Sequence, residues 1–161
     1  MTDSNLNDAE MKNILGRQRQ AFLDEGAVTA ETRIDRLKRL YHLVGENQRE
    51  IAQACSEDFG NRSLHQSQMG EVLAVMQNCE HAIKHVRRWM KPEKRPVMFP
   101  LNILGARARV DYVPKGVIGV LGTWNFPVYT ALSPVAGIFA AGNRSMVKLS
   151  DLNPATAGLL Q

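Results

Sequence analysis

Polar side chains that can bind a ligand stand where two short apolar segments end. Asn125 follows the segment 117–121. Lys148 and Asp151 lie at the end of the segment 145–149. An asparagine amide donates hydrogen bonds without carrying charge, a lysine offers a cation, and an aspartate accepts hydrogen bonds from hydroxyl groups. Together they indicate recognition of a polar ligand, although each alone is also typical of a turn or a solvated strand end.

The apolar segments that hold these side chains predict two parallel strands joined by a helix. Residues 117–121 are almost continuously apolar between two glycines, as in a strand covered on both faces. Residues 128–141 predict a buried helix, kinked at Pro134. In such units ligands bind beyond the carboxyl ends of the strands, where Asn125 and Lys148 lie.

The residues before this unit show the apolar spacing of amphipathic helices. We expect one helix over residues 10–23 and a second that Thr29 caps, whose apolar stripe continues to Phe59. Ser63 opens a third helix that runs to Met90. The sequence therefore predicts an α/β fold, with amino-terminal helices followed by the first strands of a Rossmann-like parallel sheet.

The stretch between the helices and the strands has a different composition. Residues 91–100 are rich in proline and charge and predict an exposed connection. Residues 101–113 alternate apolar and polar side chains and predict a bulged strand or a hairpin arm. Residues 1–9 are polar and are expected to fray.

The net charge and the cysteine content exclude few classes of protein and identify no binding partner. The net charge of +4 is mild, and the basic run 84–95 contains one aromatic residue, Trp89, so a solvated helix end accounts for it. Two alternatives stay open, a short helical interaction module and a basic nucleic-acid-binding protein. No apolar run is long enough to span a bilayer, and the cysteine usage agrees with the cytoplasm.

The cysteines and histidines do not have the spacing of a metal site. Cys55 and Cys79 fall on apolar helix stripes, as small core residues do. His81 and His85 stand four residues apart, but no third ligand accompanies them. We therefore expect no bound metal.

The motifs around Asn125 and Lys148 resemble the aldehyde dehydrogenase family. The resemblance covers about residues 15–161 and narrows to the coniferyl aldehyde dehydrogenase branch. The family motifs are Pro114-Lys-Gly-Val117, Trp124-Asn-Phe-Pro127, Gly142-Asn143 and Lys148-Leu-Ser-Asp151. The branch motifs are Asp58-Phe-Gly-Asn-Arg-Ser63, Arg88-Trp-Met90 and Gly105-Ala-Arg-Ala-Arg109.

The resemblance implies roles for individual residues. It implies that the amide of Asn125 stabilises the oxyanion formed when a cysteine thiolate attacks an aldehyde. It also implies cofactor contacts at five positions: Thr123, Trp124, Lys148, Ser150 and Asp151. Of these, Lys148 and Asp151 would contact the ribose. Leu149 stands where the family has proline, and Asp151 where it has glutamate. A carboxylate at this place favours NAD over NADP, because it repels a 2′-phosphate.

The resemblance also implies that the chain is the amino-terminal part of a longer enzyme. Its catalytic cysteine, its glutamate base and its glycine-rich turn would all lie after residue 161. We expect three parts, namely helices over 1–94, an arm that bridges subunits over 95–113 and the start of the dinucleotide-binding unit over 114–161. The complete protein would oxidise a hydrophobic or aromatic, coniferyl-type aldehyde as a homodimer or higher homo-oligomer, whereas residues 1–161 alone would be inactive.

Overall fold

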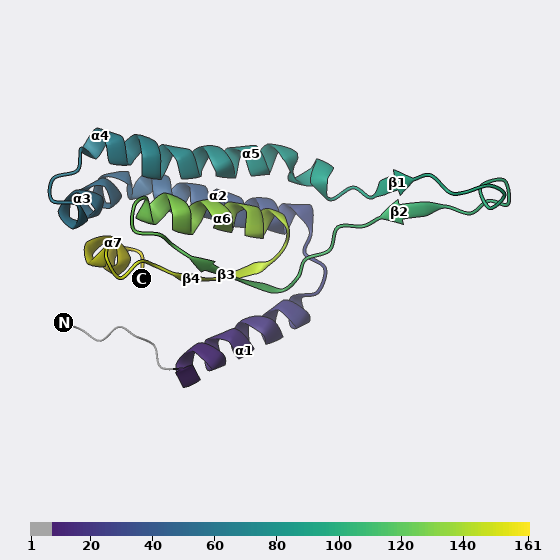
Figure 1. The fold of residues 1–161 in the computed structure, drawn as a ribbon, viewed down its shortest axis with the longest axis horizontal. Helices are drawn as coiled ribbons and strands as arrows, with labels where there is room; N and C mark the ends of the chain where they lie inside the picture. Colours follow the sequence, from purple (N-terminus) through teal and green to yellow (C-terminus); the bar gives the residue numbers. More distant parts are fainter. Residues whose placement is uncertain (1–7) are drawn as a thin grey trace.

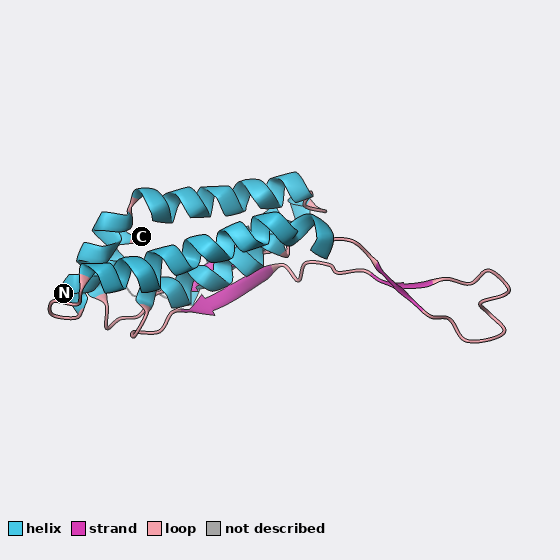
Figure 2. Cartoon of the chain, turned by 90° about the horizontal axis from the view of Figure 1, so that it is seen from above, coloured by secondary structure: helices cyan, strands magenta, loops and turns pink. Residues whose placement is uncertain are grey.

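The computed structural model describes residues 8–161. A body of helices stacks on a small parallel sheet, and a long hairpin arm leaves one end of it (Figures 1 and 2). No helix within the described range is long and apolar enough to cross a membrane. The helices are α1 (Asp8–Glu25), α2 (Ala30–Glu46), α3 (Gln48–Asp58), α4 (Leu64–Ser67), α5 (Ala74–Trp89), α6 (Pro127–Ala140) and α7 (Pro154–Leu159), with a π-helical segment at Gln68–Leu73. The strands are β1 (Glu93–Arg95), β2 (Ala108–Val110), β3 (Val117–Leu121) and β4 (Arg144–Lys148).

The parallel pair β3 and β4 confirms the predicted strand–helix–strand unit. Val117 lies opposite Arg144 and Leu121 opposite Lys148, and α6 connects the strands and packs against them. Helix α1 lies on the other side of the sheet (Figure 1). The expected cover on both faces is incomplete in the described chain, because α1 contacts the strands at Gly116 and Arg144, whereas Leu121 at the other end of β3 is 78% exposed. The predicted α/β fold class is confirmed.

The core lies where α2, α5 and α6 pack together, as their apolar spacing predicts. Its fully buried side chains include Leu37, Val44, Val75, Val86 and Val128. Burial of these side chains removes apolar surface from water, which is the main favourable term in folding. Both cysteines are buried as well, Cys55 on α3 and Cys79 on α5, so the prediction that they are core residues is confirmed.

The helix predicted from Ser63 to Met90 is not uniform. Its first turn is α4, opened by the Ser63 hydroxyl, which accepts a hydrogen bond from the Gln66 backbone. The π-helical segment then interrupts the regular pattern before α5 begins. Each residue there advances less around the axis than in an α-helix, so the polar Glu71 is fully buried and Met69 is 64% exposed.

Helix α6 runs through Pro134 without a break, so the expected kink does not interrupt the helix. The hydroxyl of the neighbouring Ser133 accepts a hydrogen bond from Nδ2 of Asn78 across 2.6 Å, which ties α6 to α5.

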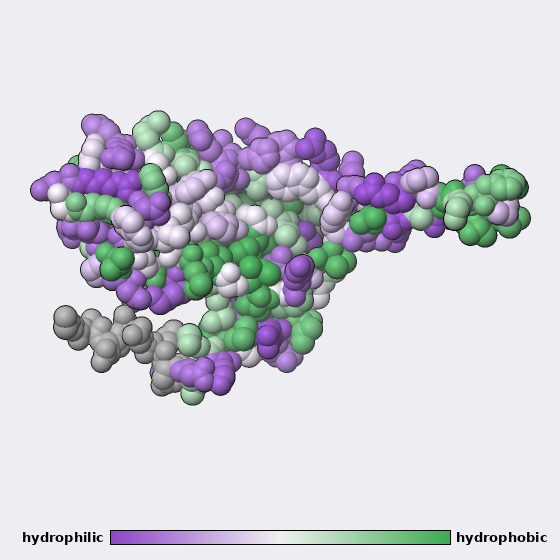
Figure 3. All heavy atoms as spheres, viewed as in Figure 1, coloured by the Kyte–Doolittle hydropathy of each residue, from purple (hydrophilic) through white to green (hydrophobic). Residues whose placement is uncertain are grey.

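The arm is a hairpin of two short antiparallel strands, in which Glu93 pairs with Val110 and Arg95 with Ala108. The hairpin arm that residues 101–113 predicted as one alternative is confirmed. Its extent was wrong, because the arm begins with β1 inside the expected connection 91–100, and residues 101–113 form a strand only at β2. Both strands are exposed on both faces, so their apolar and polar residues do not alternate between a buried and a solvent-exposed face. The tip is apolar, as Figure 3 shows.

Candidate functional site

The loop between β3 and α6 carries the residues that the sequence singled out. Gly122 begins it, and its N–H donates to the Lys148 carbonyl oxygen across 2.9 Å, so the loops after β3 and β4 start at one edge of the sheet. A Cβ at Gly122 would lie 3.3 Å from the Ala131 side chain, which explains the glycine at this close approach to α6. Thr123, Trp124 and Asn125 follow and are all exposed.

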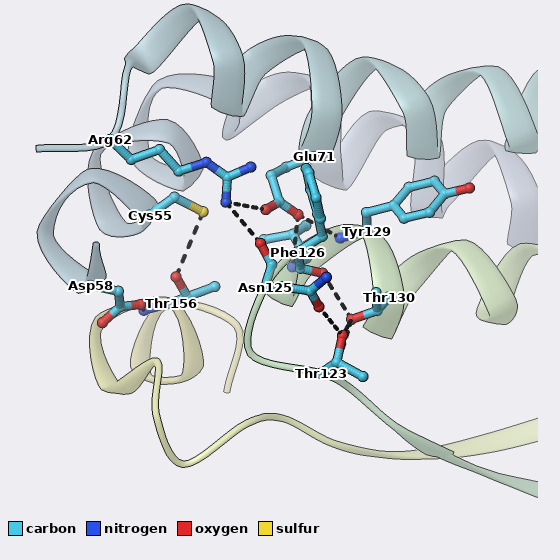
Figure 4. A network of polar contacts seen from close by, with 11 residues as sticks. Cys55, Asp58, Arg62, Glu71, Thr123, Asn125, Phe126, Tyr129, Thr130 and Thr156 are labelled. Carbon is cyan, nitrogen blue, oxygen red and sulfur yellow. Dashed lines mark hydrogen bonds and ion pairs between the residues drawn. The ribbon is translucent and has the colours of Figure 1, made fainter. Parts of the chain in front are cut away.

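Hydrogen bonds inside this loop orient the Asn125 side chain (Figure 4). The Thr123 hydroxyl donates to Oδ1 of Asn125 across 2.6 Å. The Thr123 N–H donates to the Thr130 hydroxyl across 3.0 Å, and that hydroxyl donates to the Phe126 carbonyl across 2.8 Å. Within residues 8–161, Nδ2 of Asn125 donates no hydrogen bond. The loop thus presents an uncharged N–H donor that is free to bind an external oxygen.

A buried ion pair between Arg62 and Glu71, which the sequence did not predict, anchors the backbone of this loop. Nη1 of Arg62 donates to the backbone oxygen of Asn125 across 3.2 Å and to Oε1 of Glu71 across 3.0 Å. Oε2 of Glu71 accepts from the N–H groups of Val128 and Tyr129. The carboxylate therefore caps the amino-terminal end of α6, where the helix dipole favours negative charge.

The electrostatics of Glu71 reflect two opposing effects. Burial raises the pKa of its carboxyl, while the bonds from the α6 backbone and from Arg62 act in the opposite direction. The only sequence signal for this residue is a carboxylate between Gly70 and Val72 in an otherwise apolar stretch. Its partner Arg62 lies in a motif that was noted for resemblance alone.

The two residues predicted to contact the ribose, Lys148 and Asp151, bond to each other. Nζ of Lys148 donates to Oδ1 of Asp151 and to the Leu149 carbonyl oxygen. The Ser150 hydroxyl accepts from the Leu152 N–H across 3.2 Å and shapes the same turn. The side chains of Lys148 and Asp151 are 52% and 79% exposed, so both remain accessible to a ligand.

The thiols of the described chain are not suited to nucleophilic attack. Burial raises the pKa of Cys79 to about 11 and also raises the pKa of Cys55. A thiol is reactive as a thiolate in contact with solvent, and neither cysteine meets that condition.

The histidines of α5 take part in ring stacking. The His81 and His85 ring centroids lie 4.2 Å apart, and Trp89 stacks on His85. Nδ1 of His85 also contacts the His81 carbonyl oxygen at 2.7 Å. No group of three or more histidine, cysteine or acidic side chains in residues 8–161 is arranged to hold a metal.

Known proteins resemble this chain over nearly all of its length. A protein of Caulobacter vibrioides named probable coniferyl aldehyde dehydrogenase is 43% identical over 98% of this chain and 33% of its own. The coniferyl aldehyde dehydrogenase of a Pseudomonas species is also 43% identical, over 94% of this chain and 31% of its own. The chain thus spans about a third of the length of the curated relatives it matches.

Solved structures share the fold. The aldehyde dehydrogenase of Brucella melitensis biovar abortus superposes with a TM-score of 0.82 at 27% identity, over 97% of this chain and 32% of that one. The NADP⁺ complex of succinic semialdehyde dehydrogenase from Streptococcus pyogenes superposes with a TM-score of 0.84 at 20% identity, over 99% of this chain and 34% of that one. The aldehyde dehydrogenase family model matches residues 2–161. The predicted resemblance is therefore confirmed, and the chain belongs to the aldehyde dehydrogenase family.

Proposed function

We propose that residues 1–161 are the amino-terminal part of an NAD(P)-dependent aldehyde dehydrogenase that oxidises a hydrophobic or aromatic, coniferyl-type aldehyde to its carboxylic acid. The observation that carries the proposal is the unpaired Nδ2 of Asn125 at the carboxyl edge of β3 and β4. The coniferyl aldehyde dehydrogenase relatives support the substrate class. Family membership favours this function over a helical interaction module or a nucleic-acid-binding protein.

The proposed role of Asn125 is to donate a hydrogen bond to an oxyanion. When a thiolate attacks an aldehyde carbon, the carbonyl electron pair moves onto oxygen, and a neutral N–H already in place stabilises the new charge. Because both thiols of this chain are buried, the nucleophile would come from another part of the protein. When bound, an oxidised nicotinamide dinucleotide supplies the acceptor for the hydride that leaves the carbon.

The edge that holds Asn125 also offers groups that fit a dinucleotide. Lys148 and Asp151 are exposed there, and Asp151 Oδ2 receives no hydrogen bond from the described residues. A carboxylate of this kind accepts hydrogen bonds from ribose hydroxyls and repels a 2′-phosphate, which supports NAD as the preferred cofactor. Thr123, Trp124 and Ser150 would contribute the remaining contacts.

The assembly and location of the protein are part of the same proposal. The apolar tip of the arm supports a homodimer or higher homo-oligomer, because such surface is usually covered by a partner. The two free, buried cysteines support a reducing compartment such as the cytoplasm.

The test of the proposed function is Asn125→Ala in the full-length protein. The turnover number, corrected for the folded fraction, should fall by roughly 10²–10³, the usual cost of one lost oxyanion donor. Dinucleotide affinity should change little. The control is Asn13→Ala, which removes an exposed asparagine from α1. A normal turnover number for Asn125→Ala would end the assignment.

A further inference from the structure

The backbone around Asn125 is held on both sides by one buried pair of side chains. Arg62 bonds to the carbonyl oxygen of Asn125 itself. Glu71 accepts hydrogen bonds from the first free N–H groups of α6, which lie three and four residues after Asn125. The two side chains bond to each other and are 7% and 0% exposed. The loop residue with the free amide is thus anchored to a rigid helical body.

Aromatic rings fix the orientation of the Arg62 guanidinium. Its central carbon lies 4.9 Å from the Phe59 ring centroid and 4.7 Å from the Phe126 ring centroid. Such cation–π contacts are stronger when the cation is removed from water. Nε and Nη2 are buried without a hydrogen-bond partner in the described chain, so Nη1 alone makes the bonds. The rings, rather than a carboxylate fork, set the plane of the guanidinium.

The π-helical segment brings both the acceptor and the ring support to this place. It carries Glu71, and π-helical turns occur frequently at functional sites. It also carries Gly70, where a Cβ would lie 3.1 Å from Cε1 of Phe126. A larger residue at Gly70 would therefore displace the ring that stacks on Arg62. Phe126, the N-cap residue of α6, supplies no side-chain cap, so α6 depends on Glu71.

Capping of α6 accounts for Glu71 but not for the whole arrangement. A cap needs only an acceptor for the free N–H groups of the helix. The bond from Arg62 to the Asn125 carbonyl adds nothing to that cap, yet it holds the residue that presents the amide. Catalytic groups must be held close to their productive geometry, and a misplacement of about 1 Å can lower a rate by about 10²-fold.

We propose that Arg62 and Glu71 are positioning residues for Asn125, which hold its backbone so that Nδ2 meets the oxyanion. This inference rests on the proposed function of Asn125. The pair acts only on the transition state, so its loss should lower kcat while KM and dinucleotide affinity stay nearly unchanged. A purely structural pair would change the folded fraction and leave the rate of each folded molecule intact.

The experiment is a double-mutant cycle in the full-length enzyme. Arg62→Met should lower kcat per folded molecule by roughly 10- to 100-fold in the wild-type background. In the Asn125→Ala background it should lower kcat by less than about threefold, because the side chain it positions is already gone. Losses of equal size in both backgrounds would overturn the proposal.

Arg33→Met is the matched control for loss of a buried arginine. The Arg33 guanidinium donates to the carbonyl oxygens of Val28 and Ala140, and Ala140 ends α6 far along the helix from Asn125. This variant should lower stability and leave kcat per folded molecule unchanged. An equal fall in kcat for Arg33→Met and Arg62→Met would mean that general destabilisation is the cause, and would also overturn the proposal.

Conservative variants keep the test decisive if Arg62→Met does not fold. Arg62→Lys keeps a cation for Glu71 but lacks the planar group that stacks between the rings, so kcat should still fall. If Arg62→Lys or Arg62→Met has a normal kcat while the kcat of Asn125→Ala is lowered, the positioning role is overturned and the proposed function stands. A normal kcat for Asn125→Ala overturns the proposed function and the positioning role together.

Discussion

The Thr123 hydroxyl donates a hydrogen bond to Oδ1 of Asn125 across 2.6 Å, so the amide has one side occupied and its N–H side open. The Thr130 hydroxyl holds the Thr123 backbone in turn. The family resemblance implied a cofactor contact for Thr123. The geometry suits its hydroxyl to a different task, which we propose is to fix the rotation of the asparagine amide.

Thr123→Val should therefore lower the turnover number of the full-length enzyme. The substitution removes the hydroxyl but keeps the volume of the side chain, and the lost bond is worth about 1 kcal/mol, or about a fivefold fall in kcat. Thr123→Ser keeps the hydroxyl and should retain most of the rate. Steady-state kinetics of both variants check this. If the serine variant loses as much rate as the valine variant, the hydroxyl does not orient the amide.

Acid should weaken the attachment of α1 through Glu25. Its carboxylate accepts hydrogen bonds from Arg36 on α2 and from Arg144 on β4. The bond from Arg36 and the nearby arginine charges lower the pKa of Glu25 from its ordinary value of 4.5, against the effect of burial. Because the pKa is lowered in the folded state, the stabilisation is complete above pH 4.5 and is lost as pH falls through the lower folded value.

Hydrogen exchange of the α1 amides in the full-length protein, corrected for intrinsic rates, measures this effect. Protection of residues 8–25 should fall below pH 4.5 in the wild type. In Glu25→Gln it should be lower at neutral pH and depend less on acid. Glu57→Gln, which removes an exposed carboxylate from α3, should behave as the wild type does. An acid response that survives Glu25→Gln would assign it to other groups.

The local pattern of the sequence predicted the elements that carry the candidate site. The apolar run of β3, the long apolar segment of α6 and the stripe of α5 each depend on neighbours along the chain, so periodicity identifies them. The position of Asn125 and Lys148 at one sheet edge follows from the general rule for parallel strands. These predictions needed no knowledge of which distant residues meet.

The residues that hold the site could not be predicted in this way. Arg62 bonds to Asn125 and Glu71 bonds to α6 across more than fifty positions of sequence. Their pairing also depends on a π-helical turn, which no local sequence pattern predicts. An arginine in a loop and a glutamate on a helical segment are ordinarily solvated, so the sequence does not mark either as a buried site residue. Strand β1 was missed because three charged, exposed residues carry no apolar alternation.

The tip of the arm should control assembly of the full-length protein. Met98, Phe99, Ile103 and Leu104 are each at least 71% exposed, although they are large and apolar. Clusters of this kind mark interaction sites, and the interface of a two-fold dimer uses the same patch on both subunits. In such a dimer, Leu104→Asp should therefore remove one buried apolar side chain from each of the two subunits. Burial of one such side chain contributes about 1.5–3 kcal/mol, so Kd should rise by about 10²–10⁴.

Sedimentation velocity over a range of protein concentrations measures this change. Leu104→Asp should shift the protein toward a smaller species without a change in its circular dichroism spectrum, because the tip packs against no part of the helical body (Figure 1). The matched control is Leu23→Asp, since Leu23 is 68% exposed but lies on α1. Dissociation by Leu104→Asp alone assigns the arm to the interface, whereas an unchanged species distribution in both variants places the interface elsewhere on the protein.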